Sequence, residues 1–315
     1  MNTLVVSTDG MGGTILQRLI TIVFYLEKKK VTNVWDLLNG GISTNGTSIV
    51  KSRPIDGKPD YSQTLKEISN SLINVNNDLN IICRLSKWHL DERNDRKADQ
   101  KKFLLLLKNT FEKQVVCLRK NVFEYALSLS IRNESGVSNI KNKKDRNTVN
   151  NIKHVNENFF MRMCEGYVEY VNWIDYHFPG IERVFYEDLI NDTEQIIRSL
   201  TGYDSTIKKN FGTEYRILLR NEYKLHKELI SRSKISLTKE EIMPLIKYKT
   251  AMEQIVMKGI AVHSPIKNTT LTDKKKQIEN FDHCLNKFHL FAKNHNWIDQ
   301  SNATYDFWNK KELTN

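Results

Sequence analysis

The 315-residue chain has only four cysteines and no C-x-x-C pair, which argues against a zinc knuckle and against a disulfide framework. It has no apolar run long enough to span a bilayer, no charged-then-apolar leader and no internal repeat. From these absences we expect a soluble, cytoplasmic protein built from one large α/β domain or two small ones.

Acidic residues are outnumbered by basic ones, 37 against 48, so the formal net charge is +11. Such a charge is compatible with a nucleic-acid partner. However, the basic residues are spread along a chain that is rich in Lys, Asn and Ile throughout, and a positive cleft would equally suit a small ligand with several phosphates. We therefore expect a small anionic ligand and no membrane partner. A basic nucleic-acid-binding accessory protein is kept as the last of three functional hypotheses, of which the other two follow below.

The first twenty residues carry the most informative pattern. An apolar run at 4–6 leads into Asp9-Gly10-Met11-Gly12-Gly13-Thr14, and a helix-like apolar pattern follows from Ile15. This order predicts a strand, a turn and a helix. Glycines let the backbone approach a ligand closely, and the first turn of a helix offers unpaired N–H groups to phosphate or sulfate. The segment predicts an anion-binding loop, and the alternative is an ordinary tight turn.

Two common phosphate loops do not fit this segment. A Walker A loop ends in Gly-Lys-Ser/Thr, whereas Gly13 runs directly into Thr14 without a lysine. The dinucleotide fingerprint needs a third glycine at the position of Ile15. We therefore expect neither a standard NTPase nor a dinucleotide site.

Strand-like and helix-like segments alternate along the rest of the chain. We predict further strands at residues 80–85, 114–118 and 182–186, and helices at 63–74, 121–131, 155–177 and 273–294. This alternation is typical of a parallel sheet with helices on both faces. Polar segments at 38–62 and 133–152 predict long loops. We expect an α/β domain over residues 1–261, with a helical C-terminal extension at 262–315 packed on the same domain.

Polar groups suited to an anion follow two of these strands. Lys87-Trp88-His89-Leu90 comes directly after the strand at 80–85, and Arg119-Lys120-Asn121 comes after the strand at 114–118. Ligands of such sheets bind at the carboxyl ends of the strands. Asn121 can cap the next helix, which leaves Lys120 at its positive end and Ser128 two turns further in. Lys120 and Ser128 form a candidate phosphate clamp; the alternative is a capped surface helix with a solvated lysine.

Together, four segments over roughly residues 3–200 resemble sulfotransferases that use 3′-phosphoadenosine 5′-phosphosulfate (PAPS). Gly12-Gly13-Thr14 resembles their phosphosulfate loop, and Lys87-Trp88-His89-Leu90 matches their Lys-x-His-Leu segment. Residues 120–128 match the spacing of their Arg-Asn-Pro-x-Asp/Glu-x-x-x-Ser segment, with Lys for Arg and Val for Pro, and residues 185–189 resemble a segment ending in Glu-Asp-Leu. The Asn-rich insertions and the tail are similar to those of sulfotransferase-like proteins from large viral genomes.

The resemblance implies a P-loop NTPase-like fold, PAPS as co-substrate and no metal. It makes His89 the general base that takes a proton from a hydroxyl or amine acceptor, and Lys87 the cation near the sulfuryl oxygens or departing phosphate. It places the 5′-phosphosulfate on the loop, at residues Gly10, Met11, Gly12, Gly13, Thr14 and Ile15. It gives the 3′-phosphate to Lys120 and Ser128, with Arg119 as the rival for the cationic role.

One position departs from the family's pattern. Members usually carry Lys or Arg two residues before the loop glycine, where this chain has Met11. Losing such a cation slows transfer by orders of magnitude unless another replaces it, and Arg18 and Arg84 are the candidates. The second hypothesis is therefore a weak or inactive nucleotide- or glycan-binding protein on the same fold. The acceptor pocket is expected from variable loops, whose composition fits sugar, lipid or peptide equally.

Overall fold

The computed structural model describes residues 1–27, 31–34, 37–38, 64–74, 80–93, 95–137, 143–202, 271–295, 298–300 and 304–306. The chain divides into two compact units. Unit 1 comprises residues 1–117, 181–184 and 191–260, and unit 2 comprises residues 118–180, 185–190 and 261–315.

The centre of unit 1 is a sheet with the strand order β2-β3-β1-β4-β5. β1 (Thr3–Ser7) pairs in parallel with β3 (Asn80–Ser86) and β4 (Lys113–Leu118), and β2 (Val31–Val34) pairs in parallel with β3. β5 (Glu182–Phe185) follows at the β4 edge. β1 is buried along its whole length, as expected for a central strand covered on both faces. The four parallel strands and their flanking helices confirm the predicted α/β class.

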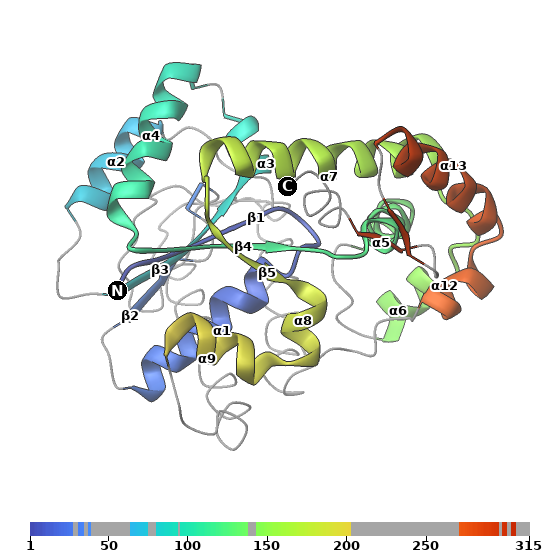
Figure 1. Cartoon of the computed structure of the whole chain (residues 1–315), viewed down its shortest axis with the longest axis horizontal. Helices are drawn as coiled ribbons and strands as arrows, with labels where there is room; N and C mark the ends of the chain where they lie inside the picture. Colours follow the sequence, from blue (N-terminus) through green and yellow to red (C-terminus); the bar gives the residue numbers. More distant parts are fainter. Residues whose placement is uncertain are drawn as a thin grey trace, which may run out of the picture. The chain divides into compact units, whose positions relative to one another are not determined.

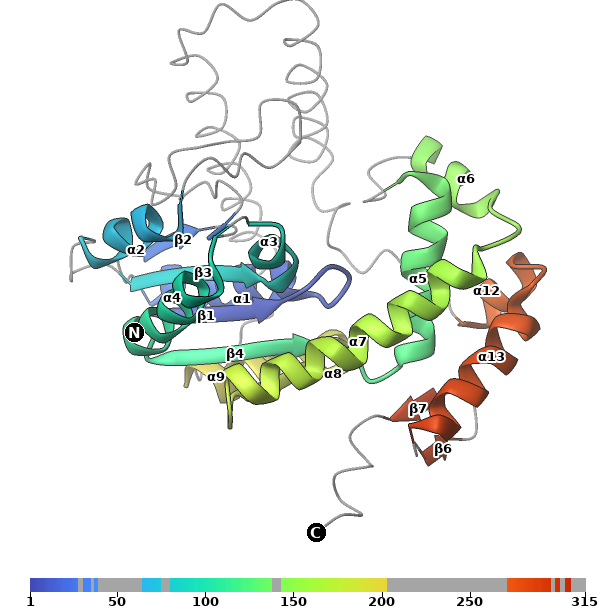
Figure 2. The same ribbon diagram turned by 90° about the horizontal axis from the view of Figure 1, so that it is seen from above.

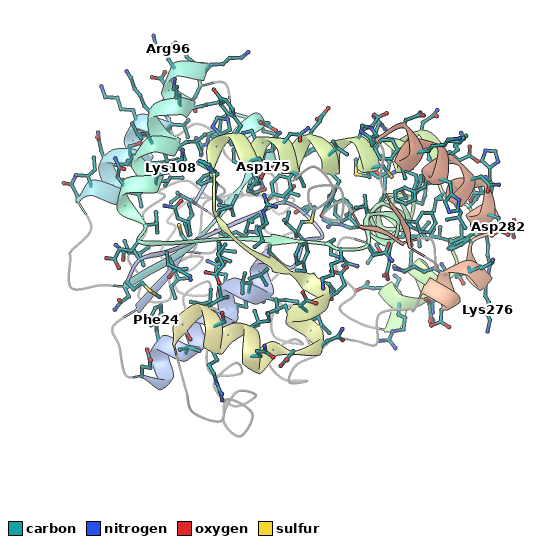
Figure 3. All side chains as sticks on the ribbon, in the orientation of Figure 1. Phe24, Arg96, Lys108, Asp175, Lys276 and Asp282 are labelled. Carbon is teal, nitrogen blue, oxygen red and sulfur yellow. The ribbon has the colours of Figure 1, made fainter. Side chains whose placement is uncertain are left out.

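Helices cover both faces of this sheet (Figure 1, Figure 2). α1 (Gly13–Leu26) packs with α9 (Thr193–Thr201) on one face, and α2 (Leu65–Ile73) packs with α4 (Lys97–Thr110) on the other. Phe24 of α1, labelled in Figure 3, is buried, as is Phe103 of α4. α3 (Lys87–Asp91) is a short helix that directly follows β3. The glycine loop and α3 thus follow the carboxyl ends of β1 and β3, which are adjacent in this sheet.

Unit 2 is mainly helical and has an aromatic core. Its elements are α5 (Val122–Ser135), α6 (Lys143–Asn150), α7 (Glu157–His177), α8 (Tyr186–Asn191), α12 (Leu271–Gln277), α13 (Phe281–Asn294), β6 (Ile298–Gln300) and β7 (Thr304–Asp306). Phe123 of α5 contacts Phe160 of α7 and Phe281 and Phe288 of α13, with ring centroids 5.3 to 5.5 Å apart. Such ring pairs each contribute about 0.5–1.5 kcal/mol beyond the area they bury.

Several elements differ from the prediction. β2 was not expected, and α6 lies within the segment 133–152 that the sequence predicted to be a loop. The helix predicted at 273–294 is divided into α12 and α13. Asn280 stands at the break, where its side chain accepts a hydrogen bond from the Val155 N–H (3.2 Å) and donates one to the Val155 carbonyl (3.0 Å). The C-terminal helices therefore take their course from contacts with a distant segment.

Other predictions fall outside the described residues. The predicted domain boundary at 261 does so, as does the loop at 38–62 apart from Leu38. Among the described helices, none is long and apolar enough to cross a bilayer. The P-loop-like identity of the fold stays a prediction.

Candidate functional site

The glycine loop of unit 1 joins the end of β1 to the start of α1. Gly10 and Gly12 have φ angles of 78° and 85°, in the left-handed region that favours glycine. The Gly12 carbonyl accepts a hydrogen bond from the Ile15 N–H at 3.0 Å, which closes the first turn. The N–H groups of Gly13 and Thr14 stand too early in the helix to have an acceptor within it. The loop thus has the backbone geometry of an anion site at the positive end of a helix.

Gly13 is required by a close approach of α1 to β1. A Cβ atom at this position would lie 2.2 Å from the Ser7 Oγ and 2.4 Å from the Ser7 Cβ. Ser7 is 1% exposed, and its Oγ has no hydrogen-bond partner among the described residues. A buried hydroxyl without a partner costs about 1–3 kcal/mol. Ser7 therefore presents an unsatisfied polar atom at the start of α1.

Arg84 of β3 reaches the same place. Its Nη1 donates a hydrogen bond to the Thr14 Oγ1 at 2.6 Å, and its Cδ lies 3.5 Å from where a Cβ of Gly13 would be. The first turn of α1 contains no acidic residue. A cation beside the positive end of a helix is unfavourable by itself. Of the two arginines considered as substitutes for a cation at position 11, Arg84 contacts the loop, whereas Arg18 is buried at 3% exposure.

Met11 anchors the loop in the core of unit 1. Its side chain is fully buried, and its carbonyl accepts a hydrogen bond from the Cys117 Sγ at 2.7 Å. Its side chain is therefore a packing element, and its backbone N–H donates to the Thr8 carbonyl at 3.4 Å.

The Lys-x-His segment forms α3 at the same sheet edge as the loop. Ser86, the last residue of β3, pairs in register with Ser7, the last residue of β1. The glycine loop and α3 therefore leave adjacent parallel strands at the same level. His89 on α3 is half-buried. Lys87 pairs with Asp91 one turn further on, so its ammonium group is engaged in a partly exposed ion pair.

In unit 2, two of the sequence segments meet at the start of α5. Arg119 Nε donates to Glu187 Oε1 at 2.8 Å, and the Lys120 N–H donates to Oε2 of the same carboxylate at 3.0 Å. The Arg119 guanidinium lies over the Tyr186 ring, 4.4 Å from its centroid. The Tyr167 hydroxyl donates to the Arg119 carbonyl. These contacts hold the strand end beside α8.

The lysine of the predicted phosphate clamp has a partner of its own. Lys120 Nζ donates to Asp188 Oδ1 at 2.7 Å, and both side chains are about two-fifths exposed (44% and 38%). Asn121 caps α5 as predicted, because its Oδ1 accepts from the Glu124 N–H at 2.8 Å. An exposed ion pair contributes about 0–1 kcal/mol, so a phosphate could displace Asp188 from Lys120 at little cost.

Ser128 is held by a lysine of the C-terminal segment. Lys274 of α12 is 5% exposed, and its Nζ donates to the Ser128 Oγ at 2.8 Å and to Glu124 Oε1 at 2.9 Å. Burial lowers the pKa of Lys274 from its ordinary value of 10.5, while attraction to Glu124 acts in the opposite direction. Arg119 Nη2 lies 3.9 Å from the other Glu124 oxygen. We call these groups the α5 charge cluster: Arg119, Lys120, Glu124, Ser128, Glu187, Asp188 and Lys274.

Removing the buried lysine should destabilise the protein. We expect Lys274→Met to lower the free energy of unfolding by about 1.5–3 kcal/mol, because Glu124 and Ser128 lose a charge-assisted donor. Since burial lowers the pKa of Lys274, the unfolded chain holds this proton more tightly than the native one. The stability of the wild type relative to the variant should therefore rise as the pH increases toward 10.5.

Chemical denaturation at several pH values measures both effects. The matched control is Lys275→Met, which removes the neighbouring, exposed lysine that pairs with Asp282 at 3.3 Å. It should change stability by about 0.5 kcal/mol or less. Equal losses in the two variants would contradict a special role for Lys274.

Sequence reasoning missed Ser7 and Lys274. Lys274 is one of three successive lysines, but it stands four residues before Ile278 and seven before Phe281. That helical spacing could have placed it on the buried face. Ser7 gives no comparable signal, because every residue of β1 is buried.

The chain was compared with known proteins. No protein-family model matches it, and no curated protein does either. The resemblance to PAPS-dependent sulfotransferases therefore depends on the four sequence segments alone. The glycine loop and the Lys-x-His segment lie together in unit 1, and residues 120–128 and 185–189 lie together in unit 2.

Proposed function

We propose that this protein is a PAPS-dependent sulfotransferase with a P-loop-like fold, which transfers a sulfuryl group to a hydroxyl or amine acceptor. The observation that supports this best is the register of Ser7 with Ser86. Because of this register, the glycine loop and the helix that carries Lys87 and His89 begin at the same level, at the carboxyl ends of two adjacent strands. Sulfuryl transfer needs this combination of an anion cradle with a base and a cation beside it.

Each group has a role in the transfer step. A lone pair of the acceptor oxygen or nitrogen attacks sulfur, the bond from sulfur to the bridging oxygen breaks, and its electron pair remains on the 5′-phosphate. His89 takes the proton of the acceptor as the new bond forms. The N–H groups of Gly13 and Thr14 hold the phosphosulfate. Lys87, exchanging Asp91 for the sulfuryl oxygens, offsets their negative charge.

The match of residues 120–128 to the family's segment supports the α5 charge cluster as the 3′-phosphate site. Lys120 and Ser128 are the proposed ligands, with Arg119 as the alternative cation. Arg119 is tied to Glu187 and is only 8% exposed, whereas Lys120 forms a partly exposed pair. Lys120 is therefore the better candidate, because its present partner is the easier to displace.

A second function, nucleotide or glycan binding with little or no transfer, is favoured by two observations. Met11 stands where the family usually has a cation, and its side chain is buried in the core. Lys87, the other cation of the predicted catalytic pair, is bonded to Asp91. A protein with these features could retain the anion cradle while transferring slowly.

A thermal-shift measurement tests the proposal. Adenosine 3′,5′-bisphosphate should raise the melting temperature of the wild type, since a ligand at a hundred times its Kd adds about 2.7 kcal/mol to stability. Lys120→Ala should weaken binding of this bisphosphate far more than binding of adenosine 5′-monophosphate. The absence of any shift would overturn the proposal, and equal losses for both nucleotides would remove Lys120 from the 3′-phosphate site.

A transfer assay with sulfuryl-labelled PAPS and a panel of hydroxyl and amine acceptors separates the two functions. Binding with transfer supports the sulfotransferase. Binding without transfer to any acceptor, and without release of sulfate to water, supports the second function.

A further inference from the structure

We propose that Arg84 supplies the positive charge that the glycine loop lacks at position 11, and that its guanidinium binds the phosphosulfate group of the donor at the start of α1. The inference rests on the proposed function. It adds Arg84 to the catalytic groups already proposed, which are the glycine loop, Lys87 and His89. It is carried by contacts within unit 1.

The position of Arg84 is the first observation. Its Nη1 lies 2.6 Å from the Thr14 Oγ1, and its Cδ lies 3.5 Å from where a Cβ of Gly13 would be, so the side chain reaches the first turn of α1. A guanidinium carries five N–H donors in a planar fork that matches the oxygens of phosphate or sulfate. The Thr14 hydroxyl takes up one of them. Arg84 and the helix start can therefore contact neighbouring oxygens of one anion.

Ser7 provides an independent observation at the same place. Its side chain is 1% exposed and its Oγ has no hydrogen-bond partner among the described residues. This hydroxyl lies so close to Gly13 that a single added Cβ would be 2.2 Å from it. Buried polar atoms are nearly always satisfied, and one left unpaired in a native structure points to a ligand or a water. Here it faces the start of the same helix that Arg84 reaches.

The electrostatics of the helix start support an anionic ligand. The amino end of a helix carries a partial positive charge, so a cation placed there is repelled until an anion binds between them. The first turn of α1 itself supplies no carboxylate. Arg84 and the amino end of α1 therefore bring two positive charges to one place, which favours an anionic ligand there.

The loop itself has no other cation for the task. Position 11, where the family's cation would stand, is occupied by the buried side chain of Met11. As the bond from sulfur to the bridging oxygen breaks, negative charge grows on the departing 5′-phosphate, and Arg84 is placed to offset it. The proton of the acceptor still goes to His89, so the step balances without any further reactant.

Two variants of Arg84 test the proposal. Arg84→Met should reduce kcat for transfer by about 100-fold or more, and should weaken binding of adenosine 3′,5′-bisphosphate. Arg84→Lys, which keeps the charge, should recover a large part of both. Arg96→Met is the matched control, because Arg96 is an exposed arginine at the start of α4 in the same unit (Figure 3). It should leave both quantities unchanged.

The unliganded proteins separate a catalytic role from a structural one. If Arg84 serves the ligand, Arg84→Met should unfold within about 3 °C of the wild type. A variant that binds and transfers like the wild type would overturn the proposal and leave the sulfotransferase function intact. The proposal would also be overturned if Arg84→Met and Arg84→Lys lost kcat and bisphosphate binding equally and unliganded Arg84→Met had a clearly lower melting temperature than the wild type. A wild type that neither binds the bisphosphate nor transfers would overturn both the function and the role of Arg84.

Discussion

His89→Ala should abolish sulfuryl transfer while leaving nucleotide binding nearly unchanged. A positioned general base contributes about 10²–10⁴-fold to a rate, and the imidazole is the candidate base on α3. The nucleotide is held by other groups, so the thermal shift with adenosine 3′,5′-bisphosphate should be close to that of the wild type. The comparison uses labelled PAPS with the acceptor that gives the wild type its highest rate.

Added imidazole gives this prediction a sharper form. If the side chain acts as a base, free imidazole should restore part of the lost rate in His89→Ala. The matched control is His283→Ala, which removes a half-exposed histidine of α13 that lies 3.1 Å from Glu157, and it should transfer at the wild-type rate. Undiminished transfer by His89→Ala would remove His89 from the mechanism.

Gly13→Ala should damage the loop and destabilise the protein. The new Cβ would lie 2.2 Å and 2.4 Å from two atoms of Ser7, whereas non-bonded carbon atoms prefer about 3.5–4.0 Å. Both residues are buried between β1 and α1, so the backbone must shift. We expect a loss of about 1–3 kcal/mol in the free energy of unfolding, together with loss of the nucleotide-induced thermal shift.

Two variants control this result. Gly166→Ala, at an exposed position of α7 with no heavy atom within 4 Å of the new Cβ, should instead stabilise the protein by about 0.5–1 kcal/mol. Ser7→Gly removes both clashing atoms. The double variant Ser7→Gly/Gly13→Ala should therefore lose less free energy of unfolding than the sum of the losses in the two single variants. A Gly13→Ala protein with wild-type stability and nucleotide binding would show that the close approach does not matter.

The strands show which part of the fold local sequence can predict. β1, β3 and β4 were predicted because each is a short apolar run bounded by turn-forming or polar residues, and β5 because Val184-Phe185-Tyr186 follows the turn-forming pair Pro179-Gly180. β2 was missed because Val31-Thr32-Asn33-Val34 has only two strongly apolar residues and follows a run of lysines. It is recruited by pairing with β3, which local sequence does not encode.

The helices of unit 2 show the same limit. α6 has no apolar stripe, because its residues are almost all polar or charged. Gln277 donates to the backbone carbonyls of Val149 and Ile152 at 2.8 Å and 2.9 Å. The end of this helix is therefore held by a residue that lies more than a hundred positions away in the sequence. A helix that depends on such contacts has no signature in its own sequence.

The amino-acid sequence by itself determined the alternation of strands and helices, the glycine loop, and the residue types at the strand ends. These follow from periodicity and backbone preference, which act over a few neighbouring residues. Only the tertiary structure decided which charged groups meet, such as Arg84 with Thr14 and Lys274 with Glu124 and Ser128. The physical reason is that these pairs join segments 70 and about 150 residues apart, and strand register and helix packing bring them together.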